Sequence, residues 1–245
     1  EVQSGELLAE FKQKKNRLWK ACFSPDGSKV LTMDDRTQLI LWDALSGELI
    51  KEYKKEYDAE ITTHWFTASG KSLITINANK KSQLTNLNDS ALSVEFNIQK
   101  PYSYAVSPTN KVLAIGSSTQ HIELFNIETG ERTDSLVPNP DKGCNGCKTR
   151  IVFSHTGKKL VSVTKYSGVD IWDVRTGEKL LNFPYEESWV DAVAFSSNDR
   201  YVMVNADDET VIWDLKLQKK LREFNFDGLE CTPVFSPDGK SILTT

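Results

Sequence analysis

Residues 23–42, FSPDGSKVLTMDDRTQLILW, contain two marks that recur along the chain at a nearly constant separation. An aromatic or apolar residue opens a Ser-Pro-Asp-Gly-like turn, and a second mark closes the unit. The opening positions are Phe23, Phe66, Val106, Phe153, Phe195 and Phe235, and the closing positions are Trp42, Thr85, Phe125, Trp172 and Trp213. The separation is 19 residues in four units and 18 in the fifth. Because the spacing stays nearly constant while the residue types vary, it indicates an internal structural repeat.

Each unit reads as four short strands joined by turns. In the first unit, KVLTM (29–33) and QLILW (38–42) are separated by a polar turn, and ELIKEY (48–53) follows a turn that ends at Gly47. Runs of four to six apolar or alternating residues, bounded by Gly, Asp, Asn and Ser, predict strands and are too short for helices. Strands of this length are not stable as an isolated sheet, so neighbouring units must stack. The sequence therefore predicts an all-β fold.

The closing mark is followed by Asp or Asn. Trp-Asp stands at 42–43, 172–173 and 213–214, with Thr-Asn at 85–86 and Phe-Asn at 125–126. With these dipeptides the whole chain resembles the WD-repeat family of β-propellers, and residues 151–180 match it best. The resemblance implies four-stranded antiparallel blades, a third-strand aromatic that fills the space between blades, and an Asp or Asn that accepts backbone N–H bonds in the next turn.

The resemblance has one departure and leaves the ring open to two interpretations. No histidine stands in the family's Gly-His slot, so we expect the family's His-Ser/Thr-Trp-Asp network to be absent. Residues 6–11 are expected to be an isolated fourth strand, followed by five complete strand sets and a partial blade from Phe235. This describes either a six-bladed ring lacking a strand or an arc of a ring of seven or more. Because a missing internal strand leaves unpaired backbone groups, we expect 1–245 to be one propeller domain truncated at both ends.

The composition of the chain limits the kinds of partner that it is expected to bind. The chain has 245 residues, 39% of them hydrophobic and 26% charged, as in a globular protein with a sizeable core. Its net charge of −4 argues against sequence-independent nucleic-acid binding, and no apolar run reaches the roughly 18 residues of a membrane helix. Four cysteines are too few for a disulfide scaffold and favour a reducing, cytoplasmic compartment. We expect no nucleic acid and no membrane as partners, and a monomer or part of a larger multidomain chain.

The candidate chemical groups are sparse. Cys144 and Cys147 form a CxxC in the longest inter-blade loop, 134–150, and are a weak candidate for a metal site or redox pair, because structural zinc takes four ligands. A ligand- or metal-sensing module on this loop is the first alternative function.

An enzyme on the propeller scaffold is the second alternative. His64, His121 and His155 fall in different slots of their units, and neither a Ser-His-Asp order nor an HExxH spacing occurs. We therefore expect no enzymatic activity and no cofactor.

The loops that the repeat leaves free to vary carry the functional hypothesis. Family geometry implies that the loops entering first strands and the turns between second and third strands share one rim. Basic residues gather in these loops over the first four blades and acidic residues over the later ones, a polarity that could orient a partner. Exposed Trp, Tyr and Arg are frequent interface anchors, although solvated loops and a plugged central channel would explain the same residues. The chain is thus predicted to be a non-catalytic scaffold that binds a protein or peptide through Lys15, Arg17, Trp19, Tyr102, Arg150, Glu187, Trp189, Asp191 and Asp208.

Overall fold

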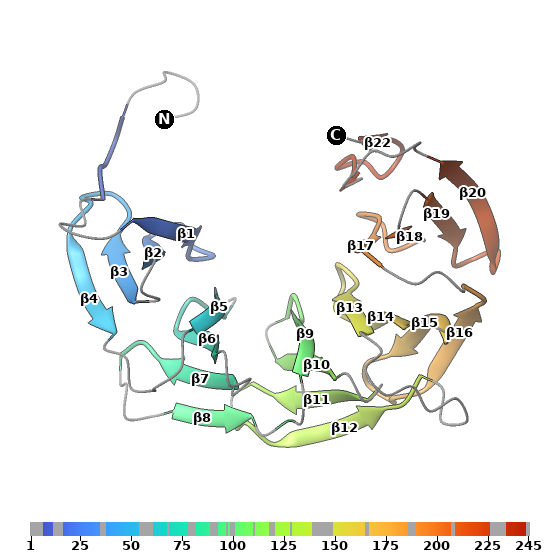
Figure 1. The fold of residues 1–245 in the computed structure, drawn as a ribbon, viewed down its shortest axis with the longest axis horizontal. Helices are drawn as coiled ribbons and strands as arrows, with labels where there is room; N and C mark the ends of the chain where they lie inside the picture. The colour runs from blue at the N-terminus through green and yellow to red at the C-terminus, as the bar shows by residue number, and fades with distance from the viewer. Residues whose placement is uncertain are drawn as a thin grey trace. The chain divides into compact units, whose positions relative to one another are not determined.

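The computed structural model forms two compact units, Glu1–Asn97 (unit 1) and Ile98–Thr245 (unit 2). Both consist of short antiparallel strands in chain order (Figure 1). The structure describes residues 7–11, 17–34, 38–53, 61–67, 69–77, 82–88, 93–96, 98, 101–109, 111–117, 121–127, 129–138, 149–164, 167–185, 190–206, 209–225 and 234–243.

Unit 1 contains two four-stranded sheets, each a meander in which neighbours in sequence are neighbours in space. Sheet 1 consists of β1 (Leu18–Phe23), β2 (Lys29–Asp34), β3 (Leu39–Asp43) and β4 (Leu49–Tyr53). Sheet 2 consists of β5 (Ile61–Phe66), β6 (Ser72–Asn77), β7 (Ser82–Asn86) and β8 (Ser93–Phe96).

Unit 2 contains three further sheets of the same kind and a two-stranded hairpin. Sheet 3 consists of β9 (Pro101–Val106), β10 (Val112–Ser117), β11 (Ile122–Asn126) and β12 (Arg132–Leu136). Sheet 4 consists of β13 (Thr149–Phe153), β14 (Lys159–Thr164), β15 (Gly168–Asp173) and β16 (Lys179–Phe183). Sheet 5 consists of β17 (Ala192–Phe195), β18 (Tyr201–Ala206), β19 (Glu209–Asp214) and β20 (Lys219–Asn225), and the hairpin of β21 (Val234–Phe235) and β22 (Ile242–Leu243).

These sheets confirm the five complete strand sets and the two-stranded start of another that the repeat predicts. The structure differs from the prediction at residues 6–11, where the sequence predicts a strand. Residues 7–11 are irregular, and among the described residues no strand pairs with them. They nevertheless lie against sheet 1, where the Phe11 and Trp42 rings meet edge-on at 6.0 Å. The segment therefore packs like a neighbouring blade without a backbone ladder.

The turn after each opening mark is fixed by the hydroxyl group of a serine or, in sheet 2, of Thr67. The Ser24 hydroxyl oxygen accepts a bond from the Lys29 backbone N–H at 2.9 Å, which fastens the start of β2. Ser154, Ser196 and Ser236 do the same for the residue five positions later. Gly27 completes its turn with φ +69°, a conformation that favours glycine. The local sequence thus explains why the first hairpin of each unit recurs.

The turn after each closing mark is fixed by the side chain of an aspartate or an asparagine. The Asp43 carboxylate accepts backbone N–H bonds from Leu45 at 3.0 Å and Ser46 at 2.9 Å. Asp173 and Asp214 accept equivalent pairs two and three residues ahead. Because N–H donors favour the ionised carboxylate, the bonds from Ser46 and Leu45 hold the pKa of Asp43 below its usual value. The role implied by the resemblance is confirmed at these three turns.

The core lies between successive sheets within each unit. In unit 1, Leu31, Met33, Leu39 and Leu41 of sheet 1 form one cluster with Leu73 and Leu87 from sheet 2 and its flanking turn. In unit 2, Trp172 packs with Leu124 and Leu136 of sheet 3. Trp213 packs on sheet 4, with ring centroids 5.8 Å from Phe183 and 5.6 Å from Tyr185. In unit 2 the third-strand tryptophan therefore fills the space against the preceding sheet.

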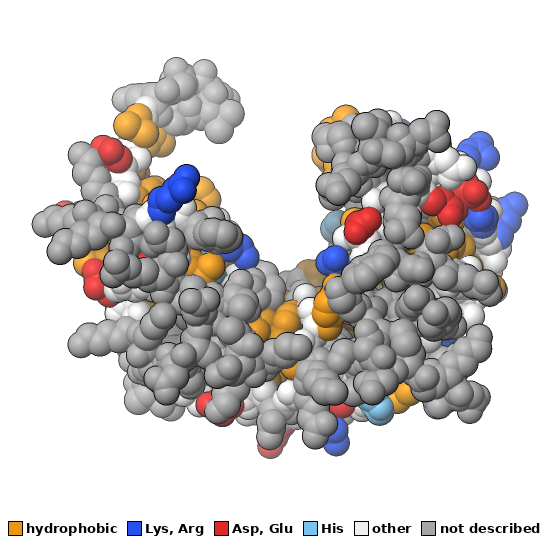
Figure 2. All heavy atoms as spheres, in the orientation of Figure 1, with side chains coloured by type: hydrophobic (Ala, Val, Ile, Leu, Met, Phe, Trp, Pro, Cys, Tyr) orange, Lys and Arg blue, Asp and Glu red, His pale blue; other side chains and the backbone are white. Residues whose placement is uncertain are grey.

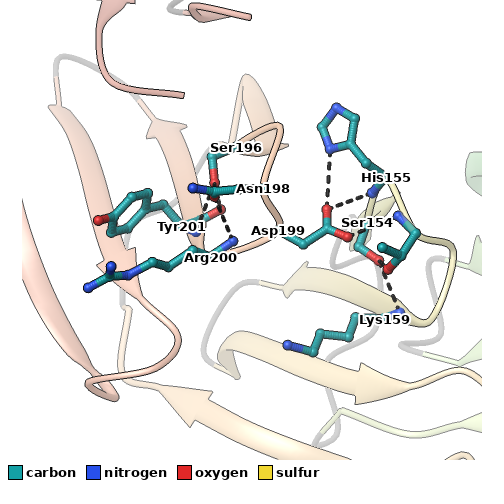
Figure 3. A network of polar contacts seen from close by, with 9 residues as sticks. Ser154, His155, Lys159, Ser196, Asn198, Asp199, Arg200 and Tyr201 are labelled. Atoms are coloured by element: carbon teal, nitrogen blue, oxygen red, sulfur yellow. Dashed lines mark hydrogen bonds and ion pairs between the residues drawn. The ribbon is translucent and has the colours of Figure 1, made fainter. Parts of the chain in front are cut away.

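A carboxylate links the first turns of sheets 4 and 5. Asp199 stands where four of the other units have glycine and keeps a positive φ of 54°. Figure 3 shows its carboxylate directed at the neighbouring turn, where it accepts the backbone N–H of His155 at 2.7 Å and of Thr156 at 2.9 Å. Its Oδ1 also lies 3.2 Å from Nδ1 of His155. Burial raises the pKa of Asp199, but these donors outweigh burial and lower it overall. We call this contact the Asp199 clamp.

Part of the network expected to be absent is present. Trp42 Nε1 donates to the Thr32 hydroxyl at 2.7 Å, and Trp172 Nε1 donates to the Ser162 hydroxyl at 2.8 Å. Both hydroxyl residues are buried on the second strands. The prediction that the whole network is absent is thus wrong for its Trp–hydroxyl bond, because that bond needs only the second and third strands and no histidine.

Candidate protein-interaction rim

The predicted rim corresponds to the ends where first strands begin. Because neighbouring strands are antiparallel, the start of a first strand lies beside the turn between the second and third strands. In unit 2 the first strands β9, β13 and β17 contact one another in sequence. Three residues predicted from the sequence stand at these starts: Tyr102, Arg150 and Asp191. We call them the rim strip.

Arg150 is half-buried near the start of β13. Its Nε donates to the backbone carbonyl of Val190 at 3.0 Å. The guanidinium group is therefore held by the segment that leads into β17 and has a defined position. An arginine fixed in this way keeps its planar fork of donors, the geometry that suits carboxylates and phosphates.

Asp191 is exposed and follows Val190 directly. Its backbone N–H donates to the Asn205 carbonyl at 2.9 Å, which ties this segment to β18. At the same end of sheet 5, Thr210 donates its hydroxyl proton to the Asn205 side chain at 2.6 Å. The structure thus brings Arg150 and Asp191 into one neighbourhood, since the arginine binds the residue next to the aspartate.

Tyr102 lies half-buried near the start of β9. The adjacent Ser103 donates its hydroxyl proton to the backbone carbonyl of Thr149, the residue before Arg150. Gly116 of β10 permits this close approach because it has no side chain. A Cβ there would lie 2.6 Å from Ser103 Oγ and 3.1 Å from the Thr149 carbonyl oxygen. Direct hydrogen bonds therefore connect β9 to β13, and β13 to the segment that leads into β17. The residues of the rim strip thus lie on backbone segments of sheets 3, 4 and 5 that are bonded to one another.

The other predicted site residues are not joined to this strip by any described contact. Arg17 is exposed immediately before β1 in unit 1, and Trp19 lies within β1, its side chain outside the described part of the structure. Lys15, Glu187, Trp189 and Asp208 also lie outside the described residues, as do Cys144 and Cys147 of the sensing alternative. These assignments stay predictions.

The charges described around sheet 5 are mixed. Lys220 and Glu223 of β20 form an ion pair, and Arg200 Nη2 binds Asp214 Oδ2 at 2.8 Å. Figure 2 shows acidic and basic side chains side by side near β20. The exposed Lys220–Glu223 pair contributes little stability, whereas Asp214 of the other pair is buried. These pairs leave the predicted polarity of the whole rim untested.

A buried carboxylate in sheet 4 escaped the sequence prediction. Asp170 is fully buried, and its Oδ1 accepts a bond from Asn182 Nδ2 at 2.7 Å and lies 3.1 Å from Lys179 Nζ. Burial raises the pKa of Asp170, and Asn182 and Lys179 oppose that shift. Lys179 also donates to the Pro138 carbonyl, next to sheet 3, and lies 5.0 Å from the centre of the Trp172 ring. The cluster therefore joins sheets 3 and 4 and is structural.

His64 is the buried histidine. It lies on β5 with 1% of its surface exposed, and neither ring nitrogen has a hydrogen-bond partner among the described residues. Burial, assisted by Lys20, lowers its pKa to about 4, so the ring is neutral at pH 7. His121 and His155 are exposed.

Groups suited to metal binding or membrane insertion were sought in the same part of the chain. No set of three or more His, Cys, Asp or Glu residues within it is placed to hold a metal ion. The described residues also include no helix whose length and hydrophobicity would let it cross a membrane.

Four-stranded antiparallel meanders that follow one another in the chain, with the third-strand tryptophans of sheets 4 and 5 packed on the preceding sheet, are the blades of a β-propeller. No family model matches the chain. It is 25% identical to pre-mRNA-processing factor 19 homolog 2 of Arabidopsis thaliana over 210 residues, 83% of this chain. It is 28% identical to the WD repeat-containing protein 26 homolog of the same plant over 200 residues, 78% of this chain.

A third relative is apoptotic protease-activating factor 1 of Danio rerio, 25% identical over 287 residues and 93% of this chain. The chain spans 39%, 32% and 22% of the lengths of these relatives, in the order given. The relatives are WD-repeat proteins, and the resemblance predicted from the sequence is confirmed.

Proposed function

We propose that this chain is a non-catalytic scaffold that binds a protein or peptide partner through the rim where its first strands begin. The observation that carries the proposal is the rim strip. Tyr102, Arg150 and Asp191 offer an aromatic surface, a cation and an anion on backbone linked by direct bonds from sheet 3 to sheet 5. A rigid platform loses little conformational entropy when it binds, which favours affinity.

The chemistry of the strip favours a partner with mixed charge. Arg150 would pair with a carboxylate or phosphate and Asp191 with a lysine or arginine, while Tyr102 would supply apolar contact area. The sequence predicts further contacts for the partner at Lys15, Arg17, Trp19, Glu187, Trp189 and Asp208. The similarity to WD-repeat proteins supports a scaffold over an enzyme.

Quantitative affinity capture tests this proposal. The immobilised chain is incubated with native lysate of the source cells, and the retained proteins are quantified by mass spectrometry. Tyr102→Ala and the double variant Arg150→Glu with Asp191→Lys are expected to lose the same set of partners. Arg150→Gln separates charge from position, because its amide can still donate to the Val190 carbonyl.

Lys158→Glu provides the matched control. Lys158 is exposed in the turn between β13 and β14, at the opposite end of β13 from Arg150. It should retain every partner, and all variants should keep the thermal melting curve of the parent chain. Partners that survive both rim variants, or that are lost with Lys158→Glu alone, would place the interaction elsewhere and refute the proposal.

A further inference from the structure

The fourth strand of sheet 5, β20, has a free edge. Among the described residues the fourth strand of each sheet pairs with the third strand alone, so this edge follows from the strand order within the sheet. β20 covers seven residues, whereas β4, β8, β12 and β16 cover four or five. All residues of β20 are exposed except Leu221, which is half-buried. Figure 1 shows β20 on the far side of sheet 5 from β17, the first strand that follows Asp191 of the rim strip.

The backbone of β20 offers hydrogen-bond donors and acceptors along this edge. Residues 222–225 pair in unbroken register with 209–212 of β19. In an antiparallel ladder every second residue directs its N–H and C=O groups away from the partner strand, and among the described residues no strand receives these groups. Leu221 is the extra residue of a bulge, which confines regular pairing to a short segment. The edge can therefore accept a short added strand.

The charge of β20 distinguishes it from the other fourth strands. β20 contains three basic residues and one acidic residue, whereas β4, β8, β12 and β16 each contain at most one basic residue. A further cation, Lys216, is exposed in the turn that precedes β20. Cations on a free edge repel an edge of like charge and so oppose self-association. The same charge favours an added strand that carries carboxylates.

The neighbouring carboxylates leave most of this positive charge uncompensated. Glu223 forms its ion pair with Lys220. The buried carboxylate of Asp214 accepts bonds from the arginine before β18 and from two backbone N–H groups of its own turn. Among the described residues, three exposed cations form no ion pair: Lys216, Lys219 and Arg222. These side chains can therefore pair with a bound anion.

We propose that the free edge of β20 is a docking site for an extended, acidic segment of a protein partner. The segment would join sheet 5 as an added strand, so that backbone hydrogen bonds to residues 222–225 supply affinity. Its carboxylates would pair with Lys216, Lys219 and Arg222. A nucleic acid fits this edge less well, because phosphates offer only acceptors and the outward carbonyl oxygens of β20 need donors. The site lies on a fourth strand, whereas the rim strip lies at the starts of first strands, so it goes beyond the proposed function.

Three synthetic peptides separate charge from strand pairing. A fluorescein-labelled peptide of sequence TEVEVETE is titrated with the chain, and fluorescence anisotropy should show saturable binding that weakens as salt is raised. The peptide TQVQVQTQ lacks the carboxylates and should bind at least about tenfold more weakly. TEVEVETE that is N-methylated at its six central residues keeps its charge but loses backbone donors on both edges. It should also bind at least about tenfold more weakly.

The protein variants locate the site. In about 0.15 M salt, Lys216→Glu should weaken binding of TEVEVETE at least about threefold, and the double variant Lys219→Glu with Arg222→Glu at least about tenfold. Arg175→Glu is the matched control, because Arg175 is exposed three residues after the closing mark of sheet 4, as Lys216 is in sheet 5. It should bind like the parent. Amide hydrogen exchange within 222–225 should slow when the peptide binds, and circular dichroism checks that all variants are folded.

Several outcomes would overturn the proposal. They are no saturable binding up to about 1 mM chain, equal binding of TQVQVQTQ or of the N-methylated peptide, and unchanged binding to both Lys216→Glu and the double variant. Octauridylate RNA that displaces TEVEVETE at equal concentration would show a general polyanion site and refute strand pairing. The rim variant Tyr102→Ala should bind TEVEVETE like the parent, so the two proposals fail separately.

Discussion

The bond between Trp172 and Ser162 gives the sharpest energetic prediction. Ser162 is fully buried, Trp172 is 4% exposed, and Nε1 donates to the serine hydroxyl at 2.8 Å. Trp172→Phe removes the donor and also leaves a cavity, so it should cost about 2–4 kcal/mol of unfolding free energy. Ser162→Ala leaves the indole N–H without this acceptor and should cost about 1–2 kcal/mol.

The double variant isolates the hydrogen bond. Because Trp172→Phe and Ser162→Ala each break the same bond, their combination should cost about 1 kcal/mol less than the sum of the two single changes. Urea unfolding followed by far-ultraviolet circular dichroism measures all four free energies without relying on tryptophan fluorescence. A coupling within about 0.3 kcal/mol of zero, below the usual additivity error, would refute the reasoning.

Trp213 is the internal control. Val204 takes the place of Ser162 on β18, since Ser162 pairs with the residue two before Trp172 and Val204 pairs with the residue two before Trp213. Trp213→Phe therefore removes packing without breaking an equivalent bond, and it should cost roughly 1–2 kcal/mol less than Trp172→Phe. An equal cost would mean that the hydroxyl bond contributes nothing.

Three further predictions concern stability. Because the folded-state pKa of His64 is lowered to about 4 from 6.5, the unfolded chain binds more protons between these values, and unfolding free energy should fall by roughly 2–3 kcal/mol as pH drops through that window. His64→Gln should flatten this dependence in urea titrations and exposed His121→Gln should not; the opposite pattern contradicts the assignment. Asp199→Gly relieves a positive φ but removes the acceptors of two backbone N–H groups, and it should lower the unfolding free energy by about 1 kcal/mol. A glycine variant that is more stable than the parent would show that the Asp199 clamp does not hold the two turns together. At Gly168, φ is +87° and a Cβ would lie 2.3 Å from the Phe183 carbonyl oxygen, whereas no atom lies within 4 Å of a Cβ built at Gly27. Gly168→Ala should therefore lower the unfolding free energy by at least about 3 kcal/mol, and Gly27→Ala by roughly 1 kcal/mol. Similar shifts in melting temperature for the two variants would refute the steric argument.

The strands and turns of this fold were predictable from the sequence because they depend on local spacing. Ser24, Gly27 and Asp43 act within a few residues of themselves, and the same letters recur in other units. Asp199 shows the same logic, since it stands at a glycine position and adopts the glycine conformation.

Contacts between strands were harder to predict. The Trp172–Ser162 bond depends on ladder register, which sets Ser162 opposite the residue two before the tryptophan. The Arg150 contact escaped because its acceptor is the Val190 backbone carbonyl, and every residue type carries such a group.

Among the predicted site residues, type and position in the repeat identified Tyr102, Arg150 and Asp191 at the starts of neighbouring first strands. Sequence could not indicate that Arg150 is held in place or that its partner adjoins Asp191, because both facts depend on strands 40 residues apart. A repeat fixes where its variable loops emerge, and the contacts between those loops depend on packing between sheets.

Site-specific photo-cross-linking tests the central claim most directly. A benzophenone side chain is placed at the position of Tyr102 or of Asp191, and in a matched sample at the position of Lys158 at the opposite end of β13. After irradiation in native lysate, the two rim positions should cross-link to the same partner protein, and position 158 should not. Cross-links from position 158 to that partner, with none from either rim position, would contradict the assignment of the rim as the binding surface.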